Sequence, residues 1–345
     1  MESTIIRQSV GIDMAMNDFK VCYGYVNTKM QHKMVAESSF DNTALGMKSL
    51  LIWLSIHLVS KKDLYFIMEA TGVYHEALCH FLYVEGFSVS VMPSGRVKKY
   101  AESLQQRSKT DLLDAKMLCV LGLERSVDLW VPAREELQDL KQLSRERGQL
   151  VKEQSALKCK LHALEHGLEA HERVVIRLKM RMNLLSEQIK EVELEMRALV
   201  VSDEELSRKS AYLTSIPGVS FLTATVVIAE TRGFQGIKNA KQLTSYTGYD
   251  VVHRESGMYK GKTSISKKGN SHIRAMLHMP SMTAVRCNPT LKPFYQRLKA
   301  KKAKPIIALV AVQRKLLCLM YTLWVNDTSY NPDYKKKSAE ALTSA

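Results

Sequence analysis

The chain has 345 residues, of which 46% are hydrophobic and 25% are charged. This length suits two or three domains with cores of their own, and the composition excludes collagen-like, low-complexity and wholly disordered proteins. The formal net charge is +15, and residues 206–345 alone carry +17, with 23 Lys and Arg against 6 Asp and Glu. Such a basic region favours a polyanion partner, most simply a nucleic acid, over a basic protein without one.

The first part of the chain shows the alternation of strands and helices typical of an α/β domain. The residue pattern predicts strands over 9–13, 19–25 and 33–39, a helix over 42–59, a strand over 64–68, a helix over 74–85 and a strand over 88–92. β-forming residues mark the strands, and apolar residues at helical spacing mark the first helix. Three adjacent strands followed by β-α units favour a ribonuclease-H-like sheet over a doubly wound one.

A heptad pattern occupies the middle of the chain, where residues 133–216 contain no proline. Steps of four and three from Leu150 to Leu199 meet an apolar residue at thirteen of fifteen positions, the exceptions being Gln154 and His171. Such a register is typical of a coiled coil, which we expect to serve interaction and not catalysis. A hairpin with its turn near residues 166–171, or a long helix packed on its own domain, would give the same pattern.

Four acidic residues stand where predicted elements end or begin. Asp13 follows the first strand, Glu69 ends the fourth, and Asp111 and Asp114 lie three apart at the start of a predicted helix, on one face of it. Several carboxylates can bridge two hard dications, which together stabilise both oxygens of a phosphodiester exchange. The alternative is that Asp111 and Asp114 are only an N-terminal charge pair of their helix.

A glycine-punctuated basic segment, residues 253–274, holds six Lys and Arg and one acid. Ser256 beside Gly257 is a candidate nucleophile there, although a solvated loop would have the same composition. Residues 214–224 resemble a helix-hairpin-helix turn, whose free backbone N–H groups can hold a phosphate, or else a plain tight turn. Residues 292–304, with six Lys and Arg and no acid, form a second basic stretch that we expect to contact a nucleic-acid backbone. The predicted nucleic-acid contacts are Lys109, which stands two residues before Asp111, and, within these motifs, Gly218, Arg254, Lys260, Lys262, Lys267 and Lys268.

The six cysteines are scattered and form no CxxC pair, so a structural zinc site is not expected. The N-terminal residues lack the apolar stretch of a signal peptide, and the longest apolar runs are too short to span a bilayer. We therefore expect a cytoplasmic protein without a membrane partner.

In chain order, the motifs are Gly-Ile-Asp13, Met-Glu69-Ala-Thr-Gly72, Lys109-Thr-Asp-x-x-Asp-Ala115, the heptad region, Ile216-Pro-Gly218, and Glu255-Ser-Gly257 with Ile265-Ser-Lys267 and Gly269. Together they closely resemble the DEDD transposases of insertion-sequence family 110, relatives of the Piv and MooV DNA recombinases. The resemblance runs from about residue 10 to residue 320. The four acids in their sequence context, paired with the Glu-Ser-Gly segment, are its specific part.

The resemblance implies a RuvC-like, ribonuclease-H-like catalytic domain over residues 1–130, a coiled-coil segment over 131–205 and a mostly helical transposase domain over 206–345. It implies that Asp13, Glu69, Asp111 and Asp114 bind Mg²⁺, two ions per site. It also implies that Ser256 attacks the scissile phosphate and forms a transient phosphoserine link.

Members of this family are similar in using a bridge RNA encoded beside their gene, which pairs with target and donor DNA. They act as dimers that pair into a tetramer, on DNA in a bacterial or archaeal cell. Three other functions remain open: a site-specific DNA invertase of the Piv type, a RuvC-like junction nuclease in which Ser256 is idle, and a coiled-coil nucleic-acid-binding protein without activity.

Overall fold

The computed structural model describes residues 4–59, 63–70, 72–104, 110–169, 171–253, 255–261, 263–301 and 304–333. The chain forms two compact units, Met1–Pro132 and Ala133–Ala345. Each unit has hydrophobic cores of its own.

The first unit contains a five-stranded mixed sheet with the strand order β3-β2-β1-β4-β5. Its strands are β1 (Ile5–Met14), β2 (Asp18–Asn27), β3 (His32–Asp41), β4 (Leu64–Glu69) and β5 (Ser88–Met92). β1, β2 and β3 pair antiparallel, whereas β4 pairs parallel with β1 and β5 pairs parallel with β4. The α/β prediction is confirmed, and this order of strands is the one expected for a ribonuclease-H-like sheet.

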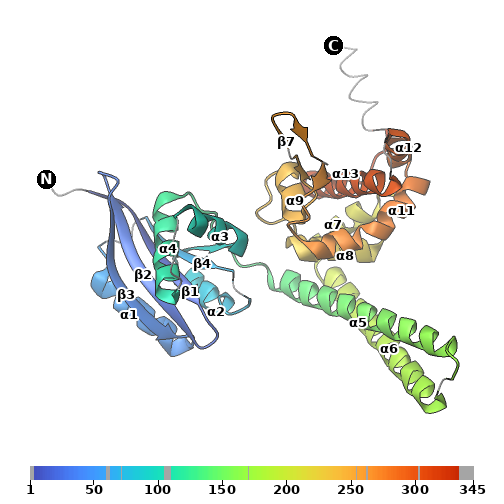
Figure 1. Cartoon of the computed structure of the whole chain (residues 1–345), viewed down its shortest axis with the longest axis horizontal. Coiled ribbons are helices and arrows are strands. Elements are labelled where there is room, and N and C mark those ends of the chain that lie inside the picture. The colour runs from blue at the N-terminus through green and yellow to red at the C-terminus, as the bar shows by residue number, and fades with distance from the viewer. Residues whose placement is uncertain are drawn as a thin grey trace, which may run out of the picture. The chain divides into compact units, whose positions relative to one another are not determined.

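Helices cover both faces of the sheet (Figure 1). They are α1 (Ala44–His57), α2 (Glu76–Val84), α3 (Ser94–Ser103) and α4 (Asp111–Glu124). α1 and α2 bury one face through a core that includes Ile12, Phe66 and Met68, and α3 and α4 bury the other through a core that includes Ile67. The sequence analysis did not predict α3, a polar helix that begins directly after Pro93, a residue favoured at helix starts.

Helix α4 lies with its backbone directly on β1. A Cβ atom on Gly11 would be 2.1 Å from the carbonyl oxygen of Ala115 and 2.1 Å from the amide of Cys119, and one on Gly122 would be 2.2 Å from Ser9 Oγ. Because later residues of α4 meet earlier residues of β1, the helix runs opposite to the strand. The N-terminal turn of α4 therefore lies at the end of β1, next to Asp13.

The second unit begins with two long helices, α5 (Glu135–Glu165) and α6 (Glu172–Ser202), which pack against each other as a hairpin (Figure 1). The heptad residues Leu178, Leu185 and Val192 are buried within this single chain. One polar exception of the pattern has a partner across the hairpin, because Gln154 Nε2 donates to Ser186 Oγ at 2.7 Å. Of the interpretations that the sequence left open, the hairpin is the one observed.

The rest of the second unit is mostly helical. It comprises α7 (Glu204–Thr214), α8 (Phe221–Thr231), α9 (Ala240–Thr247), α10 (Ser271–Met276), α11 (His278–Cys287), α12 (Leu291–Lys301) and α13 (Pro305–Asn326), with four two-residue strands between α9 and α10. These strands are β6 (Val251–Val252), β7 (Glu255–Ser256), β8 (Tyr259–Lys260) and β9 (Ser264–Ile265). Helices α8 and α13 supply much of the core, including the fully buried Val227, Ile228, Val312 and Leu316.

Helix α13 corrects one expectation from the sequence. Within the described part of the chain it is the helix that is long and apolar enough to cross a membrane, whereas the sequence analysis judged every apolar run too short. Its residues Val312, Leu316 and Met320 are fully buried in the core of the second unit. A core helix of a folded domain passes the same test of length and composition.

Candidate catalytic and nucleic-acid-binding sites

Asp13 and Glu69 lie side by side at the carboxyl ends of two parallel strands. In the register of β1 and β4, Ile12 pairs with Met68, so the two acids that follow are neighbours. Both are half-buried. Side chains two apart on a strand share a face, so Asp13 faces the same side as Gly11, which α4 covers.

Asp111 and Asp114 occupy the first turn of α4, as the sequence predicted. Thr110 begins this helix by accepting a hydrogen bond from the Leu113 amide at 3.3 Å. Because α4 runs opposite to β1, its first turn approaches the end of the strand that carries Asp13. All four acids thus lie at one edge and on one face of the sheet.

A cation that the sequence analysis missed lies in the same region. Lys20 is the cross-strand partner of Asp13, and its ammonium group donates to Asp18 Oδ2 at 2.7 Å. The hydrogen bond that Lys20 donates to Asp18 raises the pKa of Lys20, and the charges of Asp18 and Asp111 act in the same direction. The influence of Asp111 on Lys20 agrees with a first turn of α4 that lies near the end of β1.

The four acids suit a magnesium site by their chemistry. All their donor atoms are carboxylate oxygens, which hard cations such as Mg²⁺ prefer, and no thiol or imidazole belongs to the set. Among the described residues, no three His, Cys, Asp or Glu side chains are close enough together to hold an ion. The four acids therefore share one edge of the sheet, but their side chains do not form a ligand cage among the described residues.

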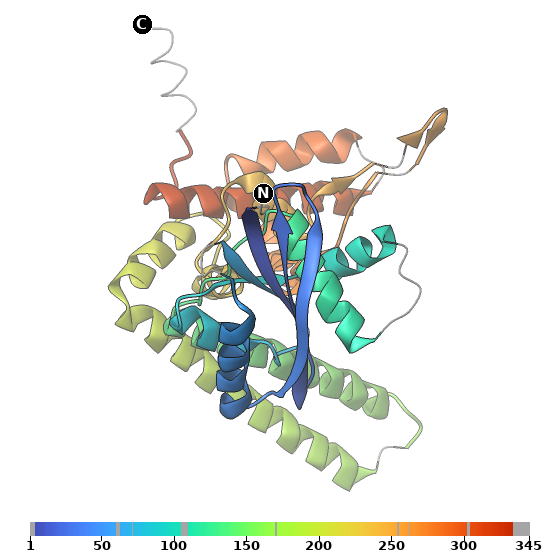
Figure 2. The same cartoon turned by 90° about the vertical axis from the view of Figure 1, so that its left-hand side faces the viewer.

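Ser256 lies near the tip of a narrow β-ribbon that stands out from the helices of its own unit (Figures 1 and 2). At the base of the ribbon β6 pairs with β9, and at its tip β7 pairs with β8. Gly257 has a φ of 54°, the positive value that a two-residue hairpin turn requires at its first position. Ser256 is exposed and lies near the start of the basic segment 253–274.

Hydrogen bonds join the base of the ribbon to the end of α9. The Lys267 amide donates to the Gly248 carbonyl at 3.1 Å, and the Asn270 amide donates to the Tyr246 carbonyl at 2.9 Å. Arg274 donates from its guanidinium to the Thr247 carbonyl at 2.7 Å. The segment after β9 is thereby fastened to the end of α9.

A buried carboxylate holds this base in place, and the sequence analysis did not find it. Glu230, at the end of α8, is fully buried and accepts hydrogen bonds from Arg145 Nε at 2.9 Å and Asn270 Nδ2 at 2.7 Å. Its backbone carbonyl accepts from the Tyr246 hydroxyl at 2.7 Å. Burial by itself would raise the pKa of Glu230. The hydrogen bonds from Arg145 and Asn270, with the charges of Arg145 and His272, outweigh burial, so the pKa lies below its ordinary value.

Removing the cation of this network is expected to destabilise the second unit. Arg145→Ala leaves the buried carboxylate of Glu230 with one partner fewer. We expect it to lower the free energy of unfolding by about 3 kcal/mol. This value is at the lower end of the range for broken buried ion pairs, because Arg145 itself is half-exposed. Arg147→Ala, on the same helix, breaks the pair with Glu193, whose carboxylate is 41% exposed and keeps its contact with water, and should cost about 1 kcal/mol or less. Urea unfolding read from Trp324, with Trp53 and Trp130 replaced by Phe, measures both.

The pH dependence of stability offers a second test of the network. The lowered pKa of Glu230 gives a stabilisation that is fully present above its ordinary value of 4.5 and is lost as the pH falls through the folded-state pKa. Arg145→Ala should therefore weaken the pH dependence of stability below that value. Equal stability losses in Arg145→Ala and Arg147→Ala would contradict a special role for the buried carboxylate.

The predicted nucleic-acid contacts fall into three groups. Lys267 and Lys268 are exposed just after β9, where a phosphate can reach them. Gly218 has a φ of 101°, and a Cβ there would lie 2.8 Å from the Ala284 amide, so the packing of α11 already explains the glycine. Three further predicted contacts lie outside the described residues, namely Lys109, Arg254 and Lys262. The side chain of Lys260 also lies outside the described part of the structure.

The predicted helix-hairpin-helix segment forms a tight turn between α7 and α8. The Val219 amide donates to the Ile216 carbonyl at 3.0 Å, and Ser220 begins α8 by accepting from the Thr223 amide at 3.2 Å. Ile216 and Val219 are buried in the core. The turn therefore has a structural role, and phosphate binding at its backbone stays a prediction.

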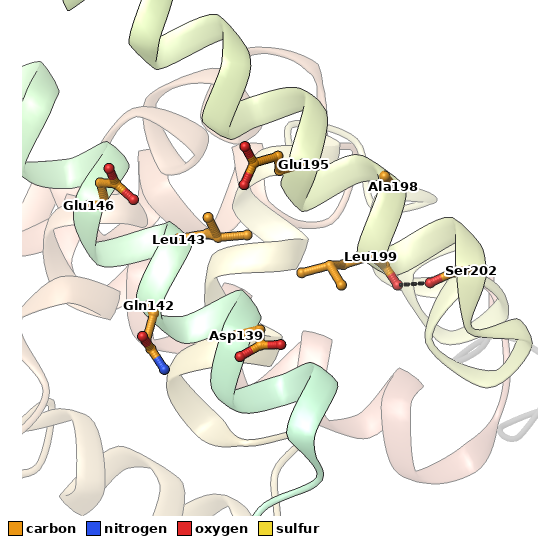
Figure 3. A pocket seen from close by; sticks show the side chains of 8 residues that line it. All are labelled: Asp139, Gln142, Leu143, Glu146, Glu195, Ala198, Leu199 and Ser202. Carbon is orange, nitrogen blue, oxygen red and sulfur yellow. Dashed lines mark hydrogen bonds between the residues drawn. The ribbon is translucent and has the colours of Figure 1, made fainter.

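A groove of about 590 Å³ lies between α5 and α6 near the start of the hairpin (Figure 3). Leu143 and Leu199 form its apolar part, and Asp139, Glu146 and Glu195 supply carboxylates around them. The Ser202 hydroxyl donates to the Leu199 carbonyl at 3.0 Å. Carboxylates repel phosphate, so this groove does not belong to the nucleic-acid-binding surface.

Comparison with known proteins gives transposase matches in both units. Residues 10–166 match the model of a DEDD transposase of IS110, and residues 210–296 match that of the transposase IS116/IS110/IS902 family. The pilin gene-inverting protein of Moraxella bovis is 28% identical over 91% of this chain and 94% of its own length. The transposase for insertion sequence element IS1328 of Yersinia enterocolitica is 24% identical over 78% of this chain and 81% of its own length. The RuvC of Thermus thermophilus bound to a Holliday junction has a TM-score of 0.28 and covers 36% of this chain and 99% of its own.

Transposase family models match residues in both units, which confirms the predicted resemblance to the DEDD transposases of insertion-sequence family 110. These matches, together with the transposase and gene-inverting relatives, indicate a DNA transposase.

Proposed function

We propose that this protein cuts and rejoins DNA strands as the transposase of a mobile element, with Mg²⁺ at Asp13, Glu69, Asp111 and Asp114 and with Ser256 as the nucleophile. The observation that carries the proposal is the gathering of four carboxylates at one edge and on one face of the first unit's sheet. The match to a transposase family model supports the reaction class.

The chemistry assigns a task to each group. When bound, two Mg²⁺ ions would stabilise the charge on the attacking and leaving oxygens of the phosphodiester. The four carboxylates would hold the ions. The Ser256 oxygen attacks phosphorus and gives up its proton, a phosphoserine bond forms, and the phosphorus–oxygen bond to the departing strand breaks, so that this strand leaves with its oxygen and takes up a proton. Lys267 and Lys268, beside the ribbon, hold the DNA backbone.

We propose further that a bridge RNA selects the target and donor DNA. The net charge of +17 over residues 206–345 supports a polyanion partner, and the family resemblance supports an RNA encoded beside the gene. The protein would then act on DNA in the cytoplasm. The test is to express the gene with its natural flanks, purify the protein and sequence the small RNA that remains bound. Purified protein without any bound RNA from those flanks would overturn the guide.

Cleavage of DNA from the element ends tests the central proposal. Purified protein with its RNA, Mg²⁺ and oligonucleotides that span those ends should give cut strands and a protein–DNA adduct on a denaturing gel. Chelation with EDTA should abolish both. Cleavage without an adduct under trapping conditions would favour a RuvC-like junction nuclease, in which water attacks and Ser256 is idle.

A site-specific DNA invertase is the second candidate function. The pilin gene-inverting protein resembles this chain along almost its full length, and inversion needs the same chemistry on another arrangement of sites. The DNA around the gene discriminates the two: element ends with a structured non-coding stretch favour transposition, and an inverted pair of sites favours inversion.

We propose that the outer face of α6 joins two copies of the chain. The heptad seam is buried inside the hairpin, whereas Ile176, Met180, Leu184 and Leu194 on another face of α6 are exposed. Met180→Asp with Leu184→Asp should reduce the mass in light scattering, because paired carboxylates disfavour burial of this face. Leu185→Asp is expected instead to unfold the hairpin. An unchanged mass for the double variant would exclude this face.

A further inference from the structure

The serine ribbon is the β-ribbon formed by β6, β7, β8 and β9, which carries Ser256. Two side chains at its tip do not take part in the packing of the unit. Met258 is 101% exposed and Tyr259 is 66% exposed. Figures 1 and 2 show the ribbon projecting away from the helices of its unit. An apolar and an aromatic side chain at such a tip gain nothing from the core, and their exposure in a soluble domain is typical of a binding surface.

We propose that Met258 and Tyr259 contact unstacked bases of the DNA strand that Ser256 attacks. Tyr259 stacks on a base, and Met258 inserts between neighbouring bases. Side chains of this kind are the ones that proteins use for these two tasks, since every base has an aromatic face and apolar wedges separate base steps. The inference rests on the proposed function of Ser256 and adds the ligand chemistry of the ribbon tip.

The register of the ribbon places the aromatic ring beside the reacting hydroxyl. Ser256 and Tyr259 are cross-strand partners in the β7–β8 ladder. Directly opposed residues of an antiparallel pair lie on the same face, with Cβ atoms about 5 Å apart. A base held on the Tyr259 ring therefore brings its own phosphate backbone to the side of the ribbon that carries Ser256.

The cations at the base of the ribbon favour a nucleic acid as the occupant over another protein surface. Lys267 and Lys268 are exposed at the base of the ribbon, and the sequence of residues 253–274 carries six cations against one acid. Cations attract the phosphates without reading sequence, whereas the aromatic ring needs a base that has left its stack. The combination fits a single strand or an opened duplex.

Salt dependence separates the two kinds of contact. Stacking releases no counterion, so Tyr259→Ser should weaken binding to single-stranded DNA by about five- to 150-fold without changing the slope of log affinity against log salt. Lys268→Gln should instead reduce that slope by about 0.7. Tyr259→Phe keeps the ring and should bind like the wild type.

The experiment uses the full-length chain with Ser256→Ala as background, so that no chemistry intervenes. Fluorescence anisotropy of a labelled single-stranded oligonucleotide of mixed sequence is measured at several KCl concentrations for Tyr259→Ser, Tyr259→Phe, Met258→Ser and Lys268→Gln. Met279, on α11, is also an exposed methionine, at 65%, and Met279→Ser is the control for Met258→Ser. Because the tip is exposed, the circular dichroism spectra should not change.

Wild-type affinity in Tyr259→Ser, or an affinity loss accompanied by a change in slope, would overturn the stacking contact. An affinity loss in Met279→Ser as large as that in Met258→Ser would overturn the wedge. The nucleophile proposal is tested by a different experiment, the detection of the covalent protein–DNA adduct. The base contacts are tested by binding measurements in which no cleavage occurs, so either proposal can fail without the other.

Discussion

Ser256→Ala is expected to abolish both strand cleavage and the covalent protein–DNA adduct while leaving nucleic-acid binding intact. The substitution removes the reacting oxygen, and the exposed position on the ribbon means that the fold does not depend on the hydroxyl. The adduct is read on a denaturing gel and binding by anisotropy. Ser256→Cys retains a nucleophilic atom at the same place and is the conservative variant.

Neighbouring serines provide the controls for this experiment. Ser264, in β9, and Ser271, at the start of α10, lie in the same segment, and their alanine variants should keep cleavage and adduct formation. Ser266 is a poorer control, because its hydroxyl donates to Asp250 at the base of the ribbon. An adduct that survives Ser256→Ala would assign the nucleophile to another residue.

Asp114→Asn and Asp13→Ala are each expected to reduce cleavage at least about a thousandfold, since a bound dication supplies several kcal/mol of transition-state stabilisation. Both residues lie at the edge where α4 meets β1, and each variant removes one negative oxygen ligand from the set. The variants should still bind DNA, because the basic excess belongs to residues 206–345. Single-turnover cleavage in Mg²⁺ measures the loss.

A metal-binding measurement checks that the loss comes from the ion. Mn²⁺ titration followed by electron paramagnetic resonance should show bound ions in the wild type and fewer or weaker sites in both variants. Asp128→Asn changes an acid of the same unit that is 85% exposed and should bind Mn²⁺ like the wild type. Cleavage that persists in EDTA, or unchanged Mn²⁺ binding in Asp114→Asn, would contradict the metal site.

The strands β4 and β5 could be predicted because each is a short, largely apolar run closed by a polar or turn residue. The run over 88–92 coincides with β5. The α3 helix could not be predicted from its apolar pattern, since only Val97 and Tyr100 of its residues are buried. The heptad pattern predicted a seam but not its partner, because the same spacing serves a second copy or a hairpin of one chain.

The acids of the candidate site could be found in the sequence because each stands at an element end, where a buried strand or a helix cap fixes its place. Glu230 gave no such signal. Its partners Arg145 and Asn270 are 85 and 40 residues away in the chain, so only the fold brings them together. Gln154 likewise looked like a defect of the heptad until Ser186 appeared opposite it.

The serine ribbon joins two regions of very different local stability. Each of its two β-ladders consists of only two residue pairs. The base of the ribbon is instead held by a hydrogen bond to the buried carboxylate of Glu230. Amide protons near the tip should therefore exchange rapidly with solvent deuterium, and those bonded at the base should exchange only when the whole unit opens.

A nucleophile on such a ribbon points in a fixed direction only when bound DNA orders the ribbon backbone. This ordering costs about 1–2 kcal/mol of conformational entropy for each residue. With Ser256 as that nucleophile, the reaction rate depends on how completely the strand immobilises the ribbon tip. Two DNAs that the basic surface binds equally tightly would then be joined at different rates, and selection between them would occur after binding, in the timing of the attack.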